Sequence, residues 1–430
     1  MPVGTHTSAL AGAAGALGTA KKRALPAATS TFSSTSSGGY SWGERGNTVG
    51  TPAEPGAVGL HNLGNTCFMN SMLQCLSATG ALTAYFKSGG WSVDLNEDNA
   101  LGADGKMARA YAELVRNLWD GRYTQVAPAA LKRVIGEHAP AFAGYQQQDS
   151  QELMIFLLDG LHEDLNRVRR KPYVEAVESD GRPDAVVAED SWRRYLLRND
   201  SVLVDRCHGL LRSHVTCPAC NYESITFDAY TCLSLPLPGA REAEDGSGKR
   251  AIPLADCFEK FLEREQLGAD NQWYCSSCKE HKQASINANA IEAYKKFDIW
   301  TTPDVLILHL KRFQYLPGQY LIHRQKIDDL VQFPVENLDL SDVLRRCGAP
   351  VHADAPPVYD LFAVSEHSGT LRGGHYTATA RNPLSGKWYG FNDGHVFETA
   401  TQQAVSPQAY VLFYARRKGA LRWGGMPGGT

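Results

Sequence analysis

The stretch that decides the fold surrounds one cysteine and reads Gly64-Asn65-Thr66-Cys67-Phe68-Met69-Asn70-Ser71-Met72. Apolar residues recur at helical spacing from there to Leu76, so the pattern predicts a helix that begins near Cys67. Free backbone N–H groups and the positive end of the helix dipole surround a thiol in a first helical turn. We therefore expect Cys67 to have a lowered pKa, about 3.5–7.5, and to act as a nucleophile.

The alternative is that Cys67 is a small buried hydrophobic residue, which is the usual fate of a free cysteine. A second stretch argues against this alternative, because it places a histidine in Gly373-Gly374-His375-Tyr376. An imidazole that lies near a thiol in space can hold it as the thiolate and carry its proton. The two stretches together predict nucleophilic catalysis by Cys67 with His375 as the base.

The composition is that of an ordinary globular protein, with 43% hydrophobic and 21% charged residues among 430. The formal net charge of -3 gives no electrostatic case for binding nucleic acid or an anionic membrane. No apolar run approaches the roughly 18 residues of a membrane span. The ten cysteines do not suggest a disulfide scaffold in a chain of this length, which indicates a reducing compartment. We expect a monomer in the cytoplasm, with the nucleus as a second location.

The order of patterns along the chain predicts the fold class. Residues 1–55 are rich in Ala, Gly, Ser and Thr, cannot bury enough surface to offset the entropy of ordering, and are expected to be disordered. Helical periodicity dominates residues 56–200, as in the segment from Asp149 to Leu165. Strand-like patterns dominate residues 201–418, and residues 419–430 are expected to be a short flexible tail. Helices followed by strands predict an α+β fold.

Four further cysteines form two Cys-x-x-Cys pairs, Cys217 with Cys220 and Cys275 with Cys278. Each pair presents two thiolates from one tight turn, and two such pairs can close a tetrahedral zinc site. A site with four thiolate ligands has no open coordination position, so this Zn²⁺ would be structural rather than catalytic. The alternatives are four unrelated reduced cysteines or a redox-active Cys-x-x-Cys pair.

Several stretches, in order, resemble the ubiquitin-specific proteases. Residues 59–71 resemble the cysteine box of that family, and residues 373–378 with Trp388-Tyr389-Gly390-Phe391-Asn392-Asp393 resemble its histidine box. Residues 146–153 and 308–313 match two blocks that lie between them. The resemblance covers roughly residues 58–417. The stretch over residues 171–200 is similar to the branch whose larger members carry DUSP and ubiquitin-like domains.

The resemblance implies a papain-like right hand. A helical thumb over about residues 56–200 would hold the cysteine helix, and a β-rich palm over about 301–418 would hold the histidine strands. Fingers tipped by zinc would lie between them, over about residues 201–300. The implied reaction is hydrolysis of the (iso)peptide bond after the C-terminal glycine of ubiquitin, so ubiquitin and ubiquitinated proteins are the expected partners.

The resemblance also assigns catalytic roles. Cys67 would attack the carbonyl and form a thioester, His375 would transfer the protons, and Asn62 would donate to the oxyanion. Two other functions stay open at this point. The chain could be a catalytically inactive scaffold that binds ubiquitin, or a protease for another ubiquitin-like modifier.

The residue that orients His375 is either Asn392 or Asp393. The family usually has Asp directly after the aromatic residue, whereas this chain has Asn392 there, followed by Asp393. Asn can orient an imidazole through its side-chain carbonyl, and Asp393 would stabilise an imidazolium by its charge. The alternative is that Asn392-Asp393-Gly394 is only a turn.

Three more residues have two possible roles. Asp149 and Glu152 have the Asp-x-x-Glu spacing of a capping box at the start of a helix. The resemblance implies instead, or in addition, that these carboxylates hold the basic C-terminal tail of ubiquitin. Tyr376 either lines the channel for that tail or fills the core.

Overall fold

The computed structural model describes residues 46–177, 179–239, 251–267, 273–281, 290–291, 293–316, 323–370 and 373–417. These residues belong to one compact unit that begins at Gly46. The expectations of disorder over residues 1–45 and of a flexible tail over residues 419–430 lie outside the described residues. Within those residues, no helix is long and apolar enough to cross a membrane.

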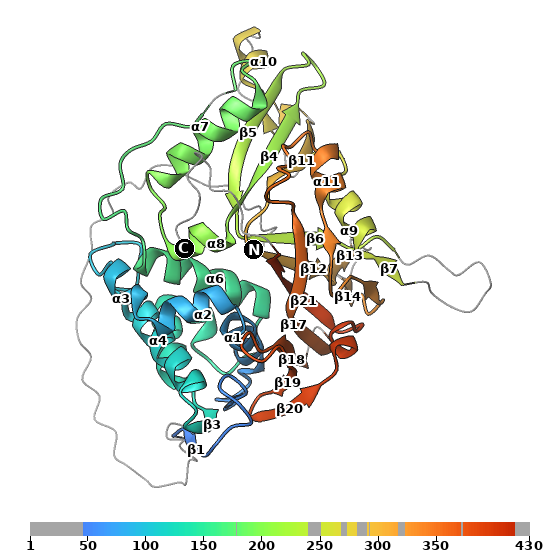
Figure 1. Ribbon diagram of the computed structural model, residues 1–430. Helices are drawn as coiled ribbons and strands as arrows, with labels where there is room; N and C mark the ends of the chain where they lie inside the picture. The colour runs from blue at the N-terminus through green and yellow to red at the C-terminus, as the bar shows by residue number, and fades with distance from the viewer. Residues whose placement is uncertain are drawn as a thin grey trace, which may run out of the picture. The chain divides into compact units, whose positions relative to one another are not determined.

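Helices dominate the first part of the described chain, as the periodicity predicted (Figure 1). They are α1 (Cys67–Ser77), α2 (Gly80–Lys87), α3 (Gly90–Asp94), α4 (Lys106–Trp119), α5 (Ala129–His138), the 3-10 turn η2 (Pro140–Phe142) and α6 (Ser150–Asp164). A small sheet with the order β1-β3-β2 lies beside them, formed by β1 (Thr48–Val49), β3 (Tyr123–Val126) and β2 (Gly59–Leu60).

Two larger sheets follow. The first has four strands in the order β5-β4-β11-β8, namely β5 (Glu223–Tyr230), β4 (Gly209–Thr216), β11 (Tyr294–Thr301) and β8 (Glu265–Gln266). The second has eight strands, of which seven run in the order β20-β19-β18-β17-β21-β12-β6. Its strands are β6 (Cys232–Pro236), β12 (Val305–Lys311), β16 (Leu338–Asp339, paired with β17), β17 (Val358–Thr370), β18 (Gly373–Arg381), β19 (Trp388–Asn392), β20 (His395–Thr399) and β21 (Ala409–Arg416).

Shorter elements connect these parts. The helical ones are α7 (Asp184–Leu196), α8 (Val202–Cys207), α9 (Leu254–Phe261), α10 (Ser276–His281), α11 (Ser341–Arg346) and the 3-10 turn η4 (Thr401–Ala404). The strands are β7 (Ile252–Pro253) with β15 (Val331–Gln332), β9 (Trp273–Tyr274) with β10 (Ala290–Ile291), and β13 (Phe313–Leu316) with β14 (His323–Lys326). Helices first and strands second confirm the predicted α+β class.

Helix α1 is the element that joins the helices to the eight-stranded sheet. All of its residues are buried, because it packs against α6 on one side and against β17 and β18 on the other. A helix that is buried all round must satisfy its polar side chains internally. Ser365 of β17 accordingly donates a hydrogen bond to Ser71 of α1, with 3.1 Å between the two Oγ atoms.

The described residues begin at Gly46 and include strand β1, which lies within the range 1–55 that was expected to be disordered. Strand β1 pairs with β3, and the side-chain oxygen of Asn47 accepts a hydrogen bond of 3.0 Å from the N–H of Ala127. Val49 is 81% exposed, so backbone pairing rather than burial orders this segment. Amino-acid composition indicates only how much surface a segment can bury, so the composition of residues 1–55 gives no signal for β1.

The predicted limits of fingers and palm also differ from those of the two sheets. Strand β6 lies in the range expected for the fingers, but it pairs in parallel with β12 in the eight-stranded sheet. Helix α7 lies in the range expected for the thumb, but it packs against β5, and its Val187 and Ala188 belong to the hydrophobic cluster under the two large sheets. These pairings are tertiary and have no local signal in the sequence.

Arg312 shows how the loop after β14 is attached to the eight-stranded sheet. The side chain is fully buried and donates to the carbonyls of Ala409 (2.6 Å), Ile327 (2.9 Å) and Asp329 (2.9 Å). Burial lowers the pKa of Arg312 to about 10, which leaves the guanidinium charged at neutral pH.

Replacement of Arg312 by Met should therefore lower the free energy of unfolding by about 2–4 kcal/mol, because three buried carbonyls lose their donor. Urea denaturation of the variant measures this loss. Lys311→Met is the matched control, since the neighbouring Lys311 is exposed and its replacement should change the midpoint little. Equal midpoints for the two variants would contradict the role given to Arg312.

Candidate active site

Cys67 lies at the first position of α1, as the sequence predicted. The backbone N–H groups of Tyr376 and Phe68 lie near its Sγ and act to lower the pKa of the thiol. The Tyr376 N–H belongs to the peptide group that joins His375 to Tyr376 in β18. The packing of α1 against β18 therefore brings Cys67 close to the backbone next to His375, although the two residues are far apart in the sequence.

The expected low pKa of Cys67 is wrong for this structure. Burial raises the pKa of the thiol, since Cys67 is only 2% exposed, and the negative charge of Asp393 raises it further. The N–H donors from Tyr376 and from the first turn of α1 lower it, but by less than burial raises it. Cys67 is therefore a neutral thiol in the free protein, and a base must remove its proton when it attacks.

His375 is oriented by Asn392. Its Nε2 lies 2.7 Å from Oδ1 of Asn392, which is the last residue of the neighbouring strand β19. A carbonyl oxygen can only accept a hydrogen bond, so Nε2 carries the proton and Nδ1 keeps its lone pair. This tautomer makes Nδ1 the atom of His375 that can receive a proton.

Asp393 has other partners. Its Oδ2 accepts a hydrogen bond from Nδ2 of Asn62 at 2.9 Å, and its Oδ1 accepts one from Nδ2 of Asn70 at 2.7 Å. Its backbone carbonyl accepts the N–H of Leu60 at 2.9 Å. Asp393 therefore connects the turn after β19 to Asn62 and to α1. Residues 392–394 also form a turn, which was the alternative given in the sequence analysis, and Asp393 has a positive φ of 49°.

Asn62 is held in one orientation by this arrangement. Its Oδ1 accepts the N–H groups of Gly64 (3.0 Å) and Thr66 (3.1 Å), which fixes where its amide nitrogen points. One of the two N–H donors on that nitrogen binds Asp393. Each side-chain amide nitrogen carries two such donors, and this hydrogen bond uses one of them.

Asn70 is a residue of this site that the sequence reasoning missed. It is buried on α1, one turn after Cys67, and donates to Asp393. The signal was an amide side chain inside a run of apolar helical residues, because a buried amide needs polar partners.

The three residues expected at the ubiquitin tail lie close together. Asp149 caps α6, with its Oδ1 accepting the N–H of Gln151 at 2.7 Å, and its Oδ2 accepts the hydroxyl of Tyr410 at 2.5 Å. Glu152 is exposed in the first turn of α6. The ring of Tyr376 is buried, so it fills the core beside Cys67. Of the two carboxylates, Glu152 is the one on the surface.

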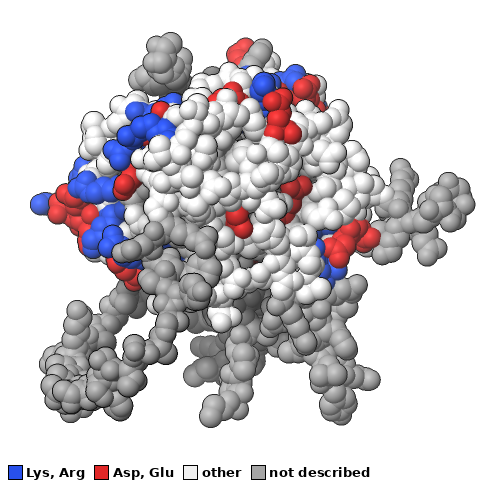
Figure 2. All heavy atoms as spheres, turned by 90° about the horizontal axis from the view of Figure 1, so that it is seen from below, with Lys and Arg blue, Asp and Glu red and all other residues white. Residues whose placement is uncertain are grey.

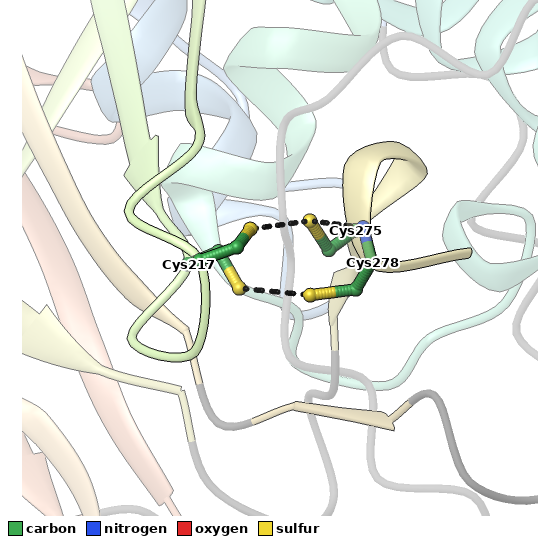
Figure 3. Close-up of side chains that lie close together, drawn as sticks. Cys217, Cys275 and Cys278 are labelled. Carbon is green, nitrogen blue, oxygen red and sulfur yellow. Dashed lines mark hydrogen bonds between the residues drawn. The ribbon is translucent and has the colours of Figure 1, made fainter. Parts of the chain in front are cut away.

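The four cysteines of the two Cys-x-x-Cys pairs converge. Their sulfur atoms all lie within 4.8 Å of one another. The Sγ of Cys217 lies 3.7 Å from that of Cys278, and the Sγ of Cys220 lies 3.6 Å from that of Cys275. Four sulfurs at about 2.3 Å from one Zn²⁺ stand roughly 3.8 Å apart in a tetrahedron, so the thiols fit that ion. Figure 3 shows the side chains meeting from the β4–β5 turn and from the start of α10.

The charged surface is mixed in sign. Figure 2 shows acidic and basic side chains side by side at the margin of one face, with a broad and mostly uncharged area between them that holds a few acidic side chains.

Comparison with known proteins identifies the family. Residues 58–414 match the family model described as ubiquitin carboxyl-terminal hydrolase. Ubiquitin carboxyl-terminal hydrolase 4 of Rattus norvegicus is 30% identical over 642 aligned positions, which include 85% of this chain and 65% of the relative. Ubiquitin carboxyl-terminal hydrolase 15 of Homo sapiens is 28% identical and shares 85% of this chain and 66% of its own length. The chain thus spans about two thirds of the length of these relatives.

Solved structures agree with the fold. The SAGA DUB module of Ubp8, Sgf11, Sus1 and Sgf73 bound to monoubiquitin contains a chain that is 25% identical, with a TM-score of 0.60 over 87% of this chain and 72% of that chain. The same module bound to ubiquitin aldehyde gives a TM-score of 0.59 at 26% identity, over 86% and 72% of the two chains. The protein belongs to the ubiquitin carboxyl-terminal hydrolase family, as its motifs predicted.

The raised pKa of Cys67 has a measurable consequence in the free protein. The rate at which iodoacetamide alkylates Cys67 should keep rising from about pH 6 to about pH 9, because the fraction of thiolate grows throughout this range. Peptide mass spectrometry separates Cys67 from the other cysteines. A plateau that is reached below about pH 7 would contradict this expectation, since it would indicate a thiolate already formed in the free protein.

Proposed function

We propose that this chain is a thiol-dependent deubiquitinase that hydrolyses the (iso)peptide bond after the C-terminal glycine of ubiquitin. The observation that carries the proposal is that α1, which begins at Cys67, packs against β18, which carries His375, and that Asn392 orients the ring of His375. The family membership and the ubiquitin-bound relatives support ubiquitin as the substrate.

In this mechanism the Sγ of Cys67 attacks the carbonyl carbon of the terminal glycine as Nδ1 of His375 takes the thiol proton. The carbonyl oxygen becomes an oxyanion and accepts the second N–H of Asn62. His375 then gives its proton to the leaving lysine amine, and a thioester remains on Cys67. Water, deprotonated by His375, attacks the thioester, and the thiol returns to Cys67 as the ubiquitin carboxylate leaves.

The neutral state of Cys67 fits this order of events. A thiol that is protonated in the free protein needs a base at the moment of attack, and His375 has a free Nδ1 for that purpose. The orientation of the imidazole through Nε2–H and an Asn carbonyl is the arrangement of Cys-His-Asn proteases. Asp393 acts in this scheme through Asn62 rather than through His375.

These assignments predict different couplings among three side chains. Asn62→Ala and Asp393→Ala should each lower kcat for a fluorogenic ubiquitin C-terminal amide by roughly 10²-fold, because each removes or misplaces the oxyanion donor. The double variant should lose little more than either single variant, since the two residues act as a unit. The losses of kcat caused by Asn392→Ala and Asp393→Ala should multiply in the double variant, because Asn392 acts on His375 and Asp393 acts on Asn62.

Cys67→Ala in the same assay should have no turnover, and it serves as the reference for zero. If the loss of kcat in the Asn62 and Asp393 double variant equals the product of the two single losses, Asp393 does not act through the oxyanion donor. An Asp393→Ala effect that Asn392→Ala abolishes would instead place Asp393 on His375. The same assay with amides of other ubiquitin-like proteins tests the choice of substrate.

We also infer that the four clustered cysteines bind a structural Zn²⁺. The ion would tie the turn between β4 and β5 to the start of α10 and would leave no position for substrate. The stacked rings of Tyr222 and Trp273, whose centroids lie 6.4 Å apart, pack against Cys217, Cys275 and Cys278, whereas Cys220 is exposed. The site supplies folding energy for the distal end of the four-stranded sheet rather than chemistry.

The zinc proposal predicts about one Zn²⁺ per chain in purified protein and a loss of that metal in Cys217→Ser. The variant should also unfold at a lower temperature, because three thiolates hold the ion more weakly than four. Elemental analysis and thermal denaturation measure the two effects. Cys347→Ser is the control, since Cys347 is buried away from the cluster. Equal zinc content in both variants would refute the assignment.

A further inference from the structure

The side chain of Gln147 makes a contact that the proposed mechanism does not use. Its Nε2 donates to the carbonyl of Gly374 at 2.5 Å, and the N–H of Gly374 donates to its Oε1 at 3.0 Å. One side-chain amide therefore binds both polar groups of a single backbone residue. A neighbouring β-strand would offer Gly374 the same pair of hydrogen bonds.

Gly374 lies on the edge of β18 that faces Cys67. Residues two apart on a strand direct their backbone groups to the same edge, which here places Gly374, Tyr376 and Ala378 in a row. Ala378 pairs with Phe391 of β19, and the Tyr376 N–H lies near Sγ of Cys67, since α1 packs against β18. Strand β19 does not extend as far as Gly374. Gln147 thus covers the β18 edge at Gly374, about 7 Å along the strand from Tyr376, whose N–H lies near the nucleophile.

The loop that carries Gln147 comes from the helical side of the molecule. It lies between η2 and α6, and Nδ2 of Asn65 donates to the carbonyl of Tyr145 in it at 3.0 Å. Nζ of Lys132 donates to the carbonyl of Ala143 at 3.2 Å. The loop is therefore fixed next to the Cys67 turn, and Gln147 is its contact with β18.

His375 does not need Gln147 for its position. Strand β18 pairs with β17 from Gly373 to Ala380, and Asn392 fixes the imidazole ring. Gly374 itself is confined, because a Cβ at this residue would lie 2.3 Å from Nε2 of the buried His367. Gln147 is exposed, so its amide can leave Gly374 without opening the core.

We propose that Gln147 stands in for substrate backbone in the free enzyme and is displaced when the extended C-terminal segment of the substrate pairs with the β18 edge at Gly374. An extended peptide whose terminal carbonyl reaches Cys67 brings its own N–H and C=O groups to this edge, one or two residues before the scissile bond. Substrate binding then breaks the two hydrogen bonds of Gln147. This inference rests on the proposed function and adds a gate to the same site.

The test compares Gln147→Ala and Gln147→Met with the wild type on a fluorogenic ubiquitin C-terminal amide. Both variants lose the amide, and Met keeps the length of the side chain. Each should lower KM by roughly three- to tenfold with kcat unchanged, because the free enzyme alone loses the pair. Gln146→Ala is the matched control, since the adjacent exposed Gln146 should leave KM and kcat unchanged.

The other outcomes are distinguishable. A fall in kcat at constant KM would overturn the proposal and make Gln147 a positioning residue for His375. A rise in KM would overturn it by making Gln147 a substrate contact, and unchanged constants would show that the pair has no role. A wild type without turnover would instead refute the proposed function.

A measurement without ubiquitin tests the pair itself. The amide hydrogen of Gly374 should exchange with solvent faster in Gln147→Ala and Gln147→Met than in the wild type and in Gln146→Ala. Equal exchange in all four proteins would show that the pair does not form in solution and would overturn the proposal, whatever the kinetics.

Discussion

The packing of α1 against β18, which brings the Tyr376 N–H near the sulfur of Cys67, is the constraint on which the rest of the site depends. It joins the first residue of α1 to β18, two segments that the chain brings together only through its tertiary fold. Helix α1 is buried on all sides, because α6 covers one face and β17 and β18 cover the other. The same burial keeps Cys67 protonated until a base acts on it.

The turn after β19 sets the remaining geometry. Asn392 and Asp393 are adjacent in sequence, yet their side chains serve different partners, the His375 ring and the Asn62 amide. The turn itself is supported from the other side, because Gly59 approaches it so closely that a Cβ would lie 2.3 Å from the Gly394 carbonyl oxygen. One turn therefore couples the His375 ring to the Asn62 amide, and a shift of this turn would disturb both.

Local patterns predicted the features that depend on local structure. The start of α1 at Cys67, the Asp149 cap of α6 and the order of helices and strands follow from periodicity and capping, which act over a few residues. The two Cys-x-x-Cys pairs predicted a common metal site because each pair presents two thiols from one tight turn. The four thiols do converge. The family motifs added the link between Cys67 and His375.

The features that the sequence could not predict depend on packing. The pKa of Cys67 rises because packing of α1 against β18 and α6 buries it, and the apolar residues after Cys67 left this outcome open as an alternative without deciding it. Asp393 forms hydrogen bonds with Asn62 and Asn70, which lie more than 300 positions away in the chain. The sequence alone therefore could not decide whether Asn392 or Asp393 orients His375. The pairing of β6 with β12 likewise depends on which strand edges meet in the folded sheet, and the local sequence of β6 does not determine this.

The most direct test of the central claim is covalent capture of the nucleophile by a ubiquitin that carries a C-terminal electrophile in place of its carboxylate. The mass of the whole protein followed by peptide mapping identifies the modified residue. The account predicts one ubiquitin added per chain, attached to Cys67, and no adduct in Cys67→Ala. An adduct on another cysteine, or none on folded protein, would contradict it.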